Sequence, residues 1–294
     1  MSKKQYGGQA VIEGVMMKGE DKIAIAVRKS PQNIIIKEES LKLDGNKYSF
    51  LKWPFVRGVV NLILSLIIGL KALTYSANQI AEEEDEELTT KELILSIVVS
   101  FGLAILLFVV LPAGIITLIQ PYIGNNIILN VIEGMIKISA FLIYIFVISR
   151  LEDIKRVFMY HGAEHKVIYN YESDLPLSVE NARKFTTLHP RCGTSFIFIV
   201  IIVSIFFFSF FGRPPLLKRI FYHLMLLPII AGTSYELIKQ AGKSKVNPII
   251  KIFSVPGLWF QKLTTNEPDD SMLEVAIEAL KAVLPAEERG ESDV

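Results

Sequence analysis

Two histidines and a glutamate within five residues give the sequence its clearest chemical signal. Residues 161–165 read H-G-A-E-H and lie in a polar segment between strongly apolar runs. Residues four apart share one face of a helix, so His161 and His165 could present two imidazoles to one ion. Glu164 would stand beside them as a base for a water activated by that ion, as in inverted zincins. The alternative is a solvated helix on which two histidines are close by chance.

A second group of possible ligands follows in the same polar segment. The chain has four histidines and one cysteine. Three of those histidines and the cysteine fall within residues 161–192, and a proline and a glycine indicate a turn at residues 189–193. Nitrogen and sulfur ligands on one helix and one turn suit zinc or a similar tetrahedral ion. The predicted ligands of this divalent metal, expected to be zinc, are His161, His165, His189 and Cys192.

Three acidic residues elsewhere are weaker candidates for a further ligand. Glu13 stands in a glycine-punctuated apolar stretch, where a solvated Glu in a tight turn is the more ordinary interpretation. Glu172 shares the helical face of the two motif histidines. Glu236 lies near the end of a downstream apolar helix, where inverted zincins carry their third ligand. Pairing with Lys239 at the level of the lipid headgroups would explain Glu236 equally well.

The composition is that of an integral membrane protein with substantial polar parts. Of the 294 residues, 51% are apolar, the mean hydropathy is +0.41 and the net charge is +1. Such a charge balance provides no basic surface for a nucleic acid. One cysteine excludes an intramolecular disulfide. No apolar run follows the first residues, so we expect no cleavable signal peptide.

The apolar runs predict a mainly α-helical, polytopic membrane protein with about four transmembrane helices. Residues 93–149 would form the first two spans, and residues 195–238 the third and fourth. Residues 55–80 carry a shorter apolar stretch between Arg57 and Lys71. As a helix this stretch rises about 18 Å, less than the hydrocarbon core of about 30 Å. We therefore expect an interfacial or re-entrant helix there, with a full span as the alternative.

Polar segments flank these spans. Residues 1–54 are expected to contain a small β-hairpin, because two β-branched runs are separated by a proline-containing turn. Residues 81–92 form an acidic linker, and residues 150–194 hold the metal motif. Residues 239–294 form a tail with an amphipathic helix and a disordered end.

The distribution of charge predicts that the metal motif faces the cytoplasm. Residues 150–194 carry seven lysines and arginines, whereas the turn at residues 120–126 carries none. Positive charge is retained on the cytoplasmic side of membrane proteins. With four spans, both termini are cytoplasmic too. If residues 55–80 also crossed, residues 1–54 and the motif would lie on opposite sides.

Several motifs together resemble one family. They are GGQAVIEGVMM at 7–17, HGAEHK at 161–166, LHPRCGTS at 188–195, PGLW at 256–259, LTT at 263–265 and EPDD at 267–270. In these motifs, and over nearly its whole length, the chain resembles the YqhQ-like family of bacterial membrane proteins. That family is of unknown function and is described as predicted metal-dependent enzymes. The resemblance implies a multi-pass protein of the bacterial inner membrane and supports a metal, without supplying a substrate.

The leading functional interpretation is a zinc-dependent hydrolase at the cytoplasmic membrane face. Glu164 would act as its base, and Arg191 would stabilise an oxyanion or bind a phosphate. The expected partners are the bilayer and a lipid-linked or membrane-peptide substrate, with no nucleic acid.

Three alternatives remain open. The four predicted ligands could close a structural site in a scaffold or assembly protein, with Glu164 solvated. A transporter could use intramembrane Glu133, Lys137 and His223, although no inverted repeat supports it. A metal-free Cys192 nucleophile assisted by His189 would rest on proximity alone.

Overall fold

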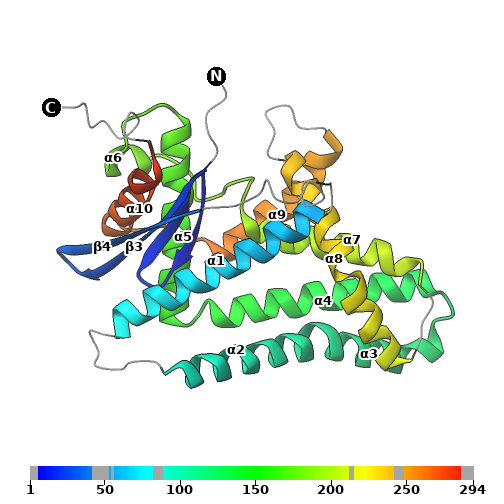
Figure 1. The fold of residues 1–294 in the computed structure, drawn as a ribbon. Helices are drawn as coiled ribbons and strands as arrows, with labels where there is room; N and C mark the ends of the chain where they lie inside the picture. Colours follow the sequence, from blue (N-terminus) through cyan, green and yellow to red (C-terminus); the bar gives the residue numbers. More distant parts are fainter. Residues whose placement is uncertain are drawn as a thin grey trace.

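The computed structural model describes residues 6–41, 53, 56–81, 89–211, 215–241 and 248–285 (Figure 1). Most of the predicted acidic linker and the predicted disordered end of the chain lie outside these residues. The described chain is mainly helical and begins with a small antiparallel sheet of strand order β1-β2-β3-β4. The strands are β1 (Gly7–Val11), β2 (Gly14–Lys18), β3 (Lys22–Ser30) and β4 (Asn33–Ser40). The predicted hairpin is confirmed as β3 and β4, and the glycine-rich stretch before it adds two further strands.

The two central strands, β2 and β3, are buried on both faces. Along β3, Ala24 and Ala26 point to one face, while Ile23, Ile25 and Val27 point to the other. This alternation follows from the two-residue period of a strand. The alanine face is covered by α5 (Glu152–Glu172), the short α6 (Val179–Ala182) and α10 (Asp270–Val283).

The amphipathic helix predicted near the C-terminus is α10, and it docks on protein. Asp269 caps its first turn by accepting a hydrogen bond from the backbone N–H of Met272 at 3.0 Å. Its apolar stripe, which includes Leu273, Ile277 and Leu280, is buried against the sheet and α5. Residues at the start and the end of the described chain therefore share one core with the helix that carries the metal motif.

Helix α1 (Val56–Ala81) has two different neighbours along its length. Its C-terminal half covers the second face of the sheet, where Ser76 accepts a hydrogen bond from the backbone N–H of Ile12 at 3.2 Å. Its N-terminal half packs against α8 (Leu216–Ala241), where Gly58 lies against Gly232. The helix is 26 residues long, well beyond the apolar stretch that the sequence marks.

Three described helical segments are long and apolar enough to cross a membrane: α1, the segment from Ile94 to Tyr122, and α4 (Asn126–Ile148). The second of these joins α2 (Thr90–Ile105), a π-helical turn η2 (Leu106–Val110), α3 (Leu111–Ile119) and the short η3 (Gln120–Tyr122). Shorter apolar stretches lie in α7 (Gly193–Ser209) and α8, and α9 (Pro248–Thr264) follows them. These helices indicate that the protein associates with a membrane.

The sheet and the apolar helices meet where α4 gives way to α5. Helical structure stops at Ser149–Leu151, and the guanidinium of Arg150 lies 4.6 Å from the ring centre of Phe146. Figure 1 shows α5 leaving the direction of α4 to pack against the sheet. The break therefore places the metal motif on a helix that packs against the sheet and not on a continuation of α4.

Candidate metal centre

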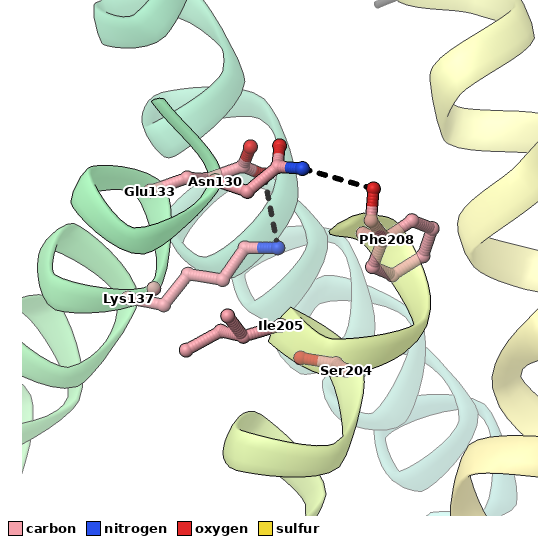
Figure 2. A pocket seen from close by; sticks show the side chains of 7 residues that line it. Asn130, Glu133, Lys137, Ser204, Ile205 and Phe208 are labelled. Carbon is pink, nitrogen blue, oxygen red and sulfur yellow. Dashed lines mark hydrogen bonds and ion pairs between the residues drawn. The ribbon is translucent and has the colours of Figure 1, made fainter. Parts of the chain in front are cut away.

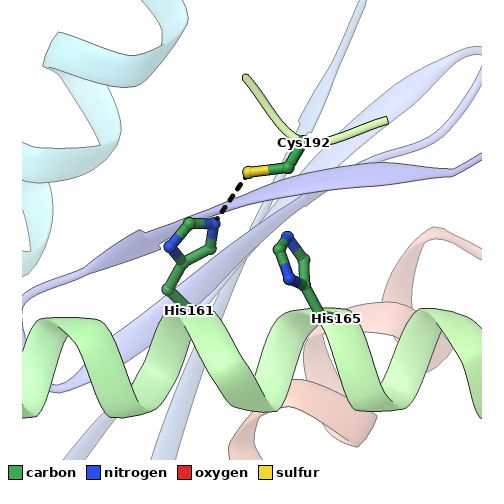
Figure 3. Close-up of side chains that lie close together, drawn as sticks. All are labelled: His161, His165 and Cys192. Atoms are coloured by element: carbon green, nitrogen blue, oxygen red, sulfur yellow. Dashed lines mark hydrogen bonds between the residues drawn. The ribbon is translucent and has the colours of Figure 1, made fainter. Parts of the chain in front are cut away.

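Helix α5 and the start of α7 bring three of the predicted ligands together. His161 and His165 lie one turn apart on the same face of α5, and Cys192 is the N-cap residue of α7 (Figure 3). One ligand atom from each of the three residues can be chosen so that all lie within 4.8 Å of one another. The Nε2 atom of His161 is 3.2 Å from the Sγ atom of Cys192. Zinc–nitrogen and zinc–sulfur bonds of about 2.0 and 2.3 Å fit such a spacing.

Two backbone carbonyls orient the imidazoles. The Nδ1 atom of His161 lies 2.8 Å from the carbonyl oxygen of Thr264, and the Nδ1 atom of His165 contacts that of Thr187. A carbonyl oxygen can only accept, so each Nδ1 carries a proton and donates it. Both Nε2 atoms are then unprotonated and can bind an ion. Metal-binding histidines are oriented by contacts of this kind.

The environment of His165 favours the uncharged imidazole that metal binding requires. His165 is buried, and this burial lowers its pKa because the imidazolium would lose its hydration. Cys192 is also buried, and its sulfur accepts a hydrogen bond from the backbone N–H of Thr194 at the start of α7. The residues present thus fit a divalent cation of the zinc type, with two nitrogen ligands and one sulfur ligand.

Glu164, the predicted base, is buried between α5 and the first strand. Burial raises the pKa of its carboxyl group, and His161, His189 and a hydrogen bond from the backbone of Gly8 act in the opposite direction. A Cβ atom at Gly8 would lie 2.9 Å from the Cγ atom of Glu164 and 2.8 Å from the carbonyl oxygen of Met16. A side chain at position 8 would clash with these atoms, so a glycine is needed for its backbone N–H to approach the carboxylate. The sequence alone did not assign Gly8 a role at the site.

His189 lies beside the three ligands but outside their group. Its ring centre is 5.5 Å from that of His165 and 4.7 Å from that of Tyr169. Its Nδ1 atom lies 3.4 Å from the backbone nitrogen of Arg191, and its Nε2 atom lies 3.7 Å from a carboxylate oxygen of Glu172. The structure therefore directs both ring nitrogens of His189 to other partners.

Arg191 and Glu172 are paired with each other. A guanidinium nitrogen of Arg191 contacts a carboxylate oxygen of Glu172 at the end of α5. This pair links the turn after His189 to the helix that carries the motif. The carboxylate is engaged away from the three ligands, and the guanidinium already has an anionic partner.

Comparisons with known proteins identify the family. Residues 53–286 match the family described as "Protein of unknown function (DUF1385)". An "Uncharacterized protein YqhQ" of Bacillus subtilis (strain 168) is 36% identical over 301 residues, which cover 98% of this chain and 95% of that protein. The chain belongs to the DUF1385 family. No solved structure matches it.

The matched DUF1385 region contains all three grouped ligands, whereas Gly8 and the sheet precede it. The likeness to the Bacillus protein nevertheless extends over nearly the whole chain. The contact between Gly8 and Glu164 makes the N-terminal strand part of the site. The structure therefore joins the DUF1385 region to a strand that precedes it.

The two remaining acidic candidates are paired with arginines. Glu13 has a positive φ of 49° in the tight turn between β1 and β2, and both its oxygens lie 2.5 Å from nitrogens of Arg156. Glu236 makes the same two-pronged contact with Arg57 of α1, at 2.7 and 2.6 Å. The side chain of Lys239, the partner that the sequence suggested for Glu236, lies outside the described part of the chain.

The acid and base within α4 also pair. A carboxylate oxygen of Glu133 lies 3.0 Å from the Nζ atom of Lys137, and both side chains line a small pocket between α4 and α7 (Figure 2). Beside them Asn130 donates a hydrogen bond to the carbonyl oxygen of Phe208 at 2.9 Å. The pair satisfies its own charges, as the spacing of four residues predicts. The side chain of His223, the third residue of the transporter interpretation, lies outside the description.

Proposed function

We propose that this DUF1385 protein is a membrane-anchored, metal-dependent hydrolase whose ion is held by His161, His165 and Cys192. The observation that carries the proposal is the convergence of these three ligands, with both Nδ1 atoms committed to backbone carbonyls. Structural zinc sites use four protein ligands, whereas catalytic sites use three and leave one position open. A group of three ligands among the described residues thus favours catalysis over the closed structural alternative.

The chain would contribute a buried carboxylate as the base. When bound, a divalent cation would polarise a carbonyl or phosphoryl oxygen and acidify a water. Glu164, three residues after His161 on the same helix, would accept a proton from that water. Because burial raises its pKa above that of an exposed carboxylate, Glu164 is a stronger base near neutral pH.

The shared core supports a particular membrane topology. The sheet, α5 and α10 pack together, so they must lie on one side of the membrane. Between the sheet and α5 run α1, the α2–α3 segment and α4, and an even number of these must cross. We assign the two crossings to α2–α3 and α4, since half of α1 covers the sheet. The hairpin of α7 and α8 then supplies the other two of four spans.

The position of the site suggests the class of substrate. Cys192 directly precedes the apolar helix α7, and three residues separate the end of α4 from the start of α5. The positive charge of residues 150–194 favours the cytoplasmic side. A metal centre at this depth would serve a lipid-linked or membrane-peptide substrate, whose scissile bond lies near the headgroups.

Glu164→Gln tests the catalytic role. The amide preserves the shape of the side chain and cannot act as a base, so metal content should be kept while turnover falls at least about 100-fold. The assay is hydrolysis of a panel of lipid phosphate esters and lipid-linked peptides in proteoliposomes. Glu180→Gln, at an exposed position on α6, is the matched control. Full activity of Glu164→Gln would favour the structural site instead.

A further inference from the structure

The C-terminal turn of α9 contacts the segments that position the three ligands. The carbonyl oxygen of Thr264 accepts from His161 at 2.8 Å. The fully buried side chain of Gln261 accepts from the backbone N–H of His189 and donates to its carbonyl oxygen, both at 2.8 Å. The hydroxyl of Thr265 lies 3.4 Å from that of Thr187, whose carbonyl orients His165. A shift of α9 would therefore change the positions of the His161 and His165 imidazoles.

The opposite face of α9 is apolar and exposed. Val255, Trp259 and Leu263 recur every four residues and are 44%, 72% and 38% exposed. Lys262, next to the stripe, is exposed as well. The inner face is buried, and the ring of Phe260 stacks on Phe141 of α4 at 4.9 Å. A helix that packs on membrane helices with one face and exposes a Trp-containing stripe on the other has the character of an interfacial helix.

The topology proposed above leaves no crossing for α9. Helices α5 and α10 share a core, and α7 and α8 pack on each other as an out-and-back hairpin. A further crossing by α9 would put α10 on the wrong side of the membrane. Helix α9 must therefore begin and end on the same side as the metal centre. Figure 1 shows it between the sheet-containing part and helices α7 and α8.

We propose that α9 lies in the bilayer interface with Val255, Trp259 and Leu263 among the lipids, and that this seating holds the metal centre in its binding geometry. The exposed stripe of α9 faces the lipid bilayer, because indole rings favour the headgroup level and the Lys262 ammonium can reach the lipid phosphates. The coupling to the centre rests on the proposed metal site. The seating of the helix does not.

The seating is tested by fluorescence. The chain has two tryptophans, so the Trp53→Phe variant leaves Trp259 as the only indole. The protein is reconstituted in phosphatidylcholine vesicles that carry a nitroxide at the headgroup, at acyl carbon 5 or at acyl carbon 12. We expect the strongest quenching from the shallow probes, with little quenching by aqueous acrylamide. Strong quenching by acrylamide without quenching by the lipid nitroxides would place Trp259 in water. Weak quenching by both would place it against another protein copy. Either result would overturn the proposal.

The coupling is tested through Cys192, the single cysteine of the chain. In metal-free vesicles, Trp259→Gln should raise the rate of Cys192 alkylation by maleimide about fivefold, because loss of the anchor eases local opening of the site. Phe101→Gln, at a position 70% exposed on α2, is the control and should leave the rate unchanged. Equal rates in the wild type and Trp259→Gln would overturn the coupling. Neither the quenching assay nor the alkylation assay needs metal. A protein that never binds zinc would therefore refute the proposed function, while both assays would still test the seating of α9 and its contact with the segment of Cys192.

Discussion

Gly162 allows the H-G-A-E-H motif on α5 and the segment that follows α9 to approach closely. A Cβ atom there would overlap the carbonyl oxygen of Asn266, whose backbone N–H donates to the carbonyl of Phe158 at 2.9 Å. The segment after α9 therefore crosses α5 directly over the glycine of the H-G-A-E-H motif. This crossing brings the carbonyl of Thr264 to His161.

Gly162→Ala should lower the stability of the protein. Forcing a methyl group into this contact should cost about 1–3 kcal/mol, read as a lower midpoint of thermal unfolding in detergent. Gly102→Ala is the matched control, since a Cβ atom there would meet nothing within 4 Å. In an open helical position alanine is favoured over glycine by about 1 kcal/mol. Equal midpoints for both variants would contradict the close crossing.

The residues that could be predicted from the sequence are those whose role follows from local spacing. His161 and His165 are four residues apart on one helix, and Cys192 lies in a recognisable turn. The contributions of Gly8, Thr187 and Thr264 pass through backbone atoms, which leave no side-chain pattern to detect. His189 has the right residue type and the right neighbourhood, but the tertiary fold turns its nitrogens elsewhere.

At the scale of elements, α1 and α8 are held together by a polar clasp at one end. Arg57 pairs with Glu236, and the side-chain amide of Asn61 donates to the hydroxyl of Tyr235 at 2.8 Å. Between these contacts Gly58 allows the helix backbones to approach closely. The sequence could not pair Glu236 with a residue 179 positions away, because local spacing indicates only neighbours along the helix.

The charge pair of this clasp should be interchangeable. Arg57→Glu alone places two carboxylates together and should lower the thermal midpoint in detergent. The double variant Arg57→Glu with Glu236→Arg should recover much of the loss, because the pair is restored in reverse. Lys71→Glu, an exposed position on the same helix, controls for the change in net charge. If the double variant were as unstable as the sum of its single variants, the pair would have no stabilising role.

Element boundaries followed the sequence where hydrophobic period or turn chemistry was strong. The β3–β4 hairpin and the long apolar helices are examples. Strands β1 and β2 are only five residues each and rich in glycine, so their pairing depends on the helices that cover them. Helix α1 matches the helix predicted over residues 55–80, and the sequence did not show that its C-terminal half covers the sheet.

At the scale of the whole molecule, the shared core of the sheet, α5 and α10 constrains the topology. Single cysteines introduced by Glu20→Cys, Asp174→Cys and Gly124→Cys, in a Cys192→Ser background, can be labelled with a membrane-impermeant maleimide. The positions at 20 and 174 should react from the same side, and the position at 124, between α3 and α4, from the other. Labelling of positions 20 and 174 from opposite sides would mean that α1 crosses and that the shared core is wrong.

The metal content of the purified protein tests the central claim most directly. Wild-type protein in detergent, analysed by elemental mass spectrometry, should hold about one zinc or related ion per chain. Binding should be lost in the His161→Ala/His165→Ala variant, weakened at least about tenfold by Cys192→Ala and kept by His189→Ala. No metal under any condition, or equal metal content in wild type and the double-histidine variant, would contradict a metal centre at these residues.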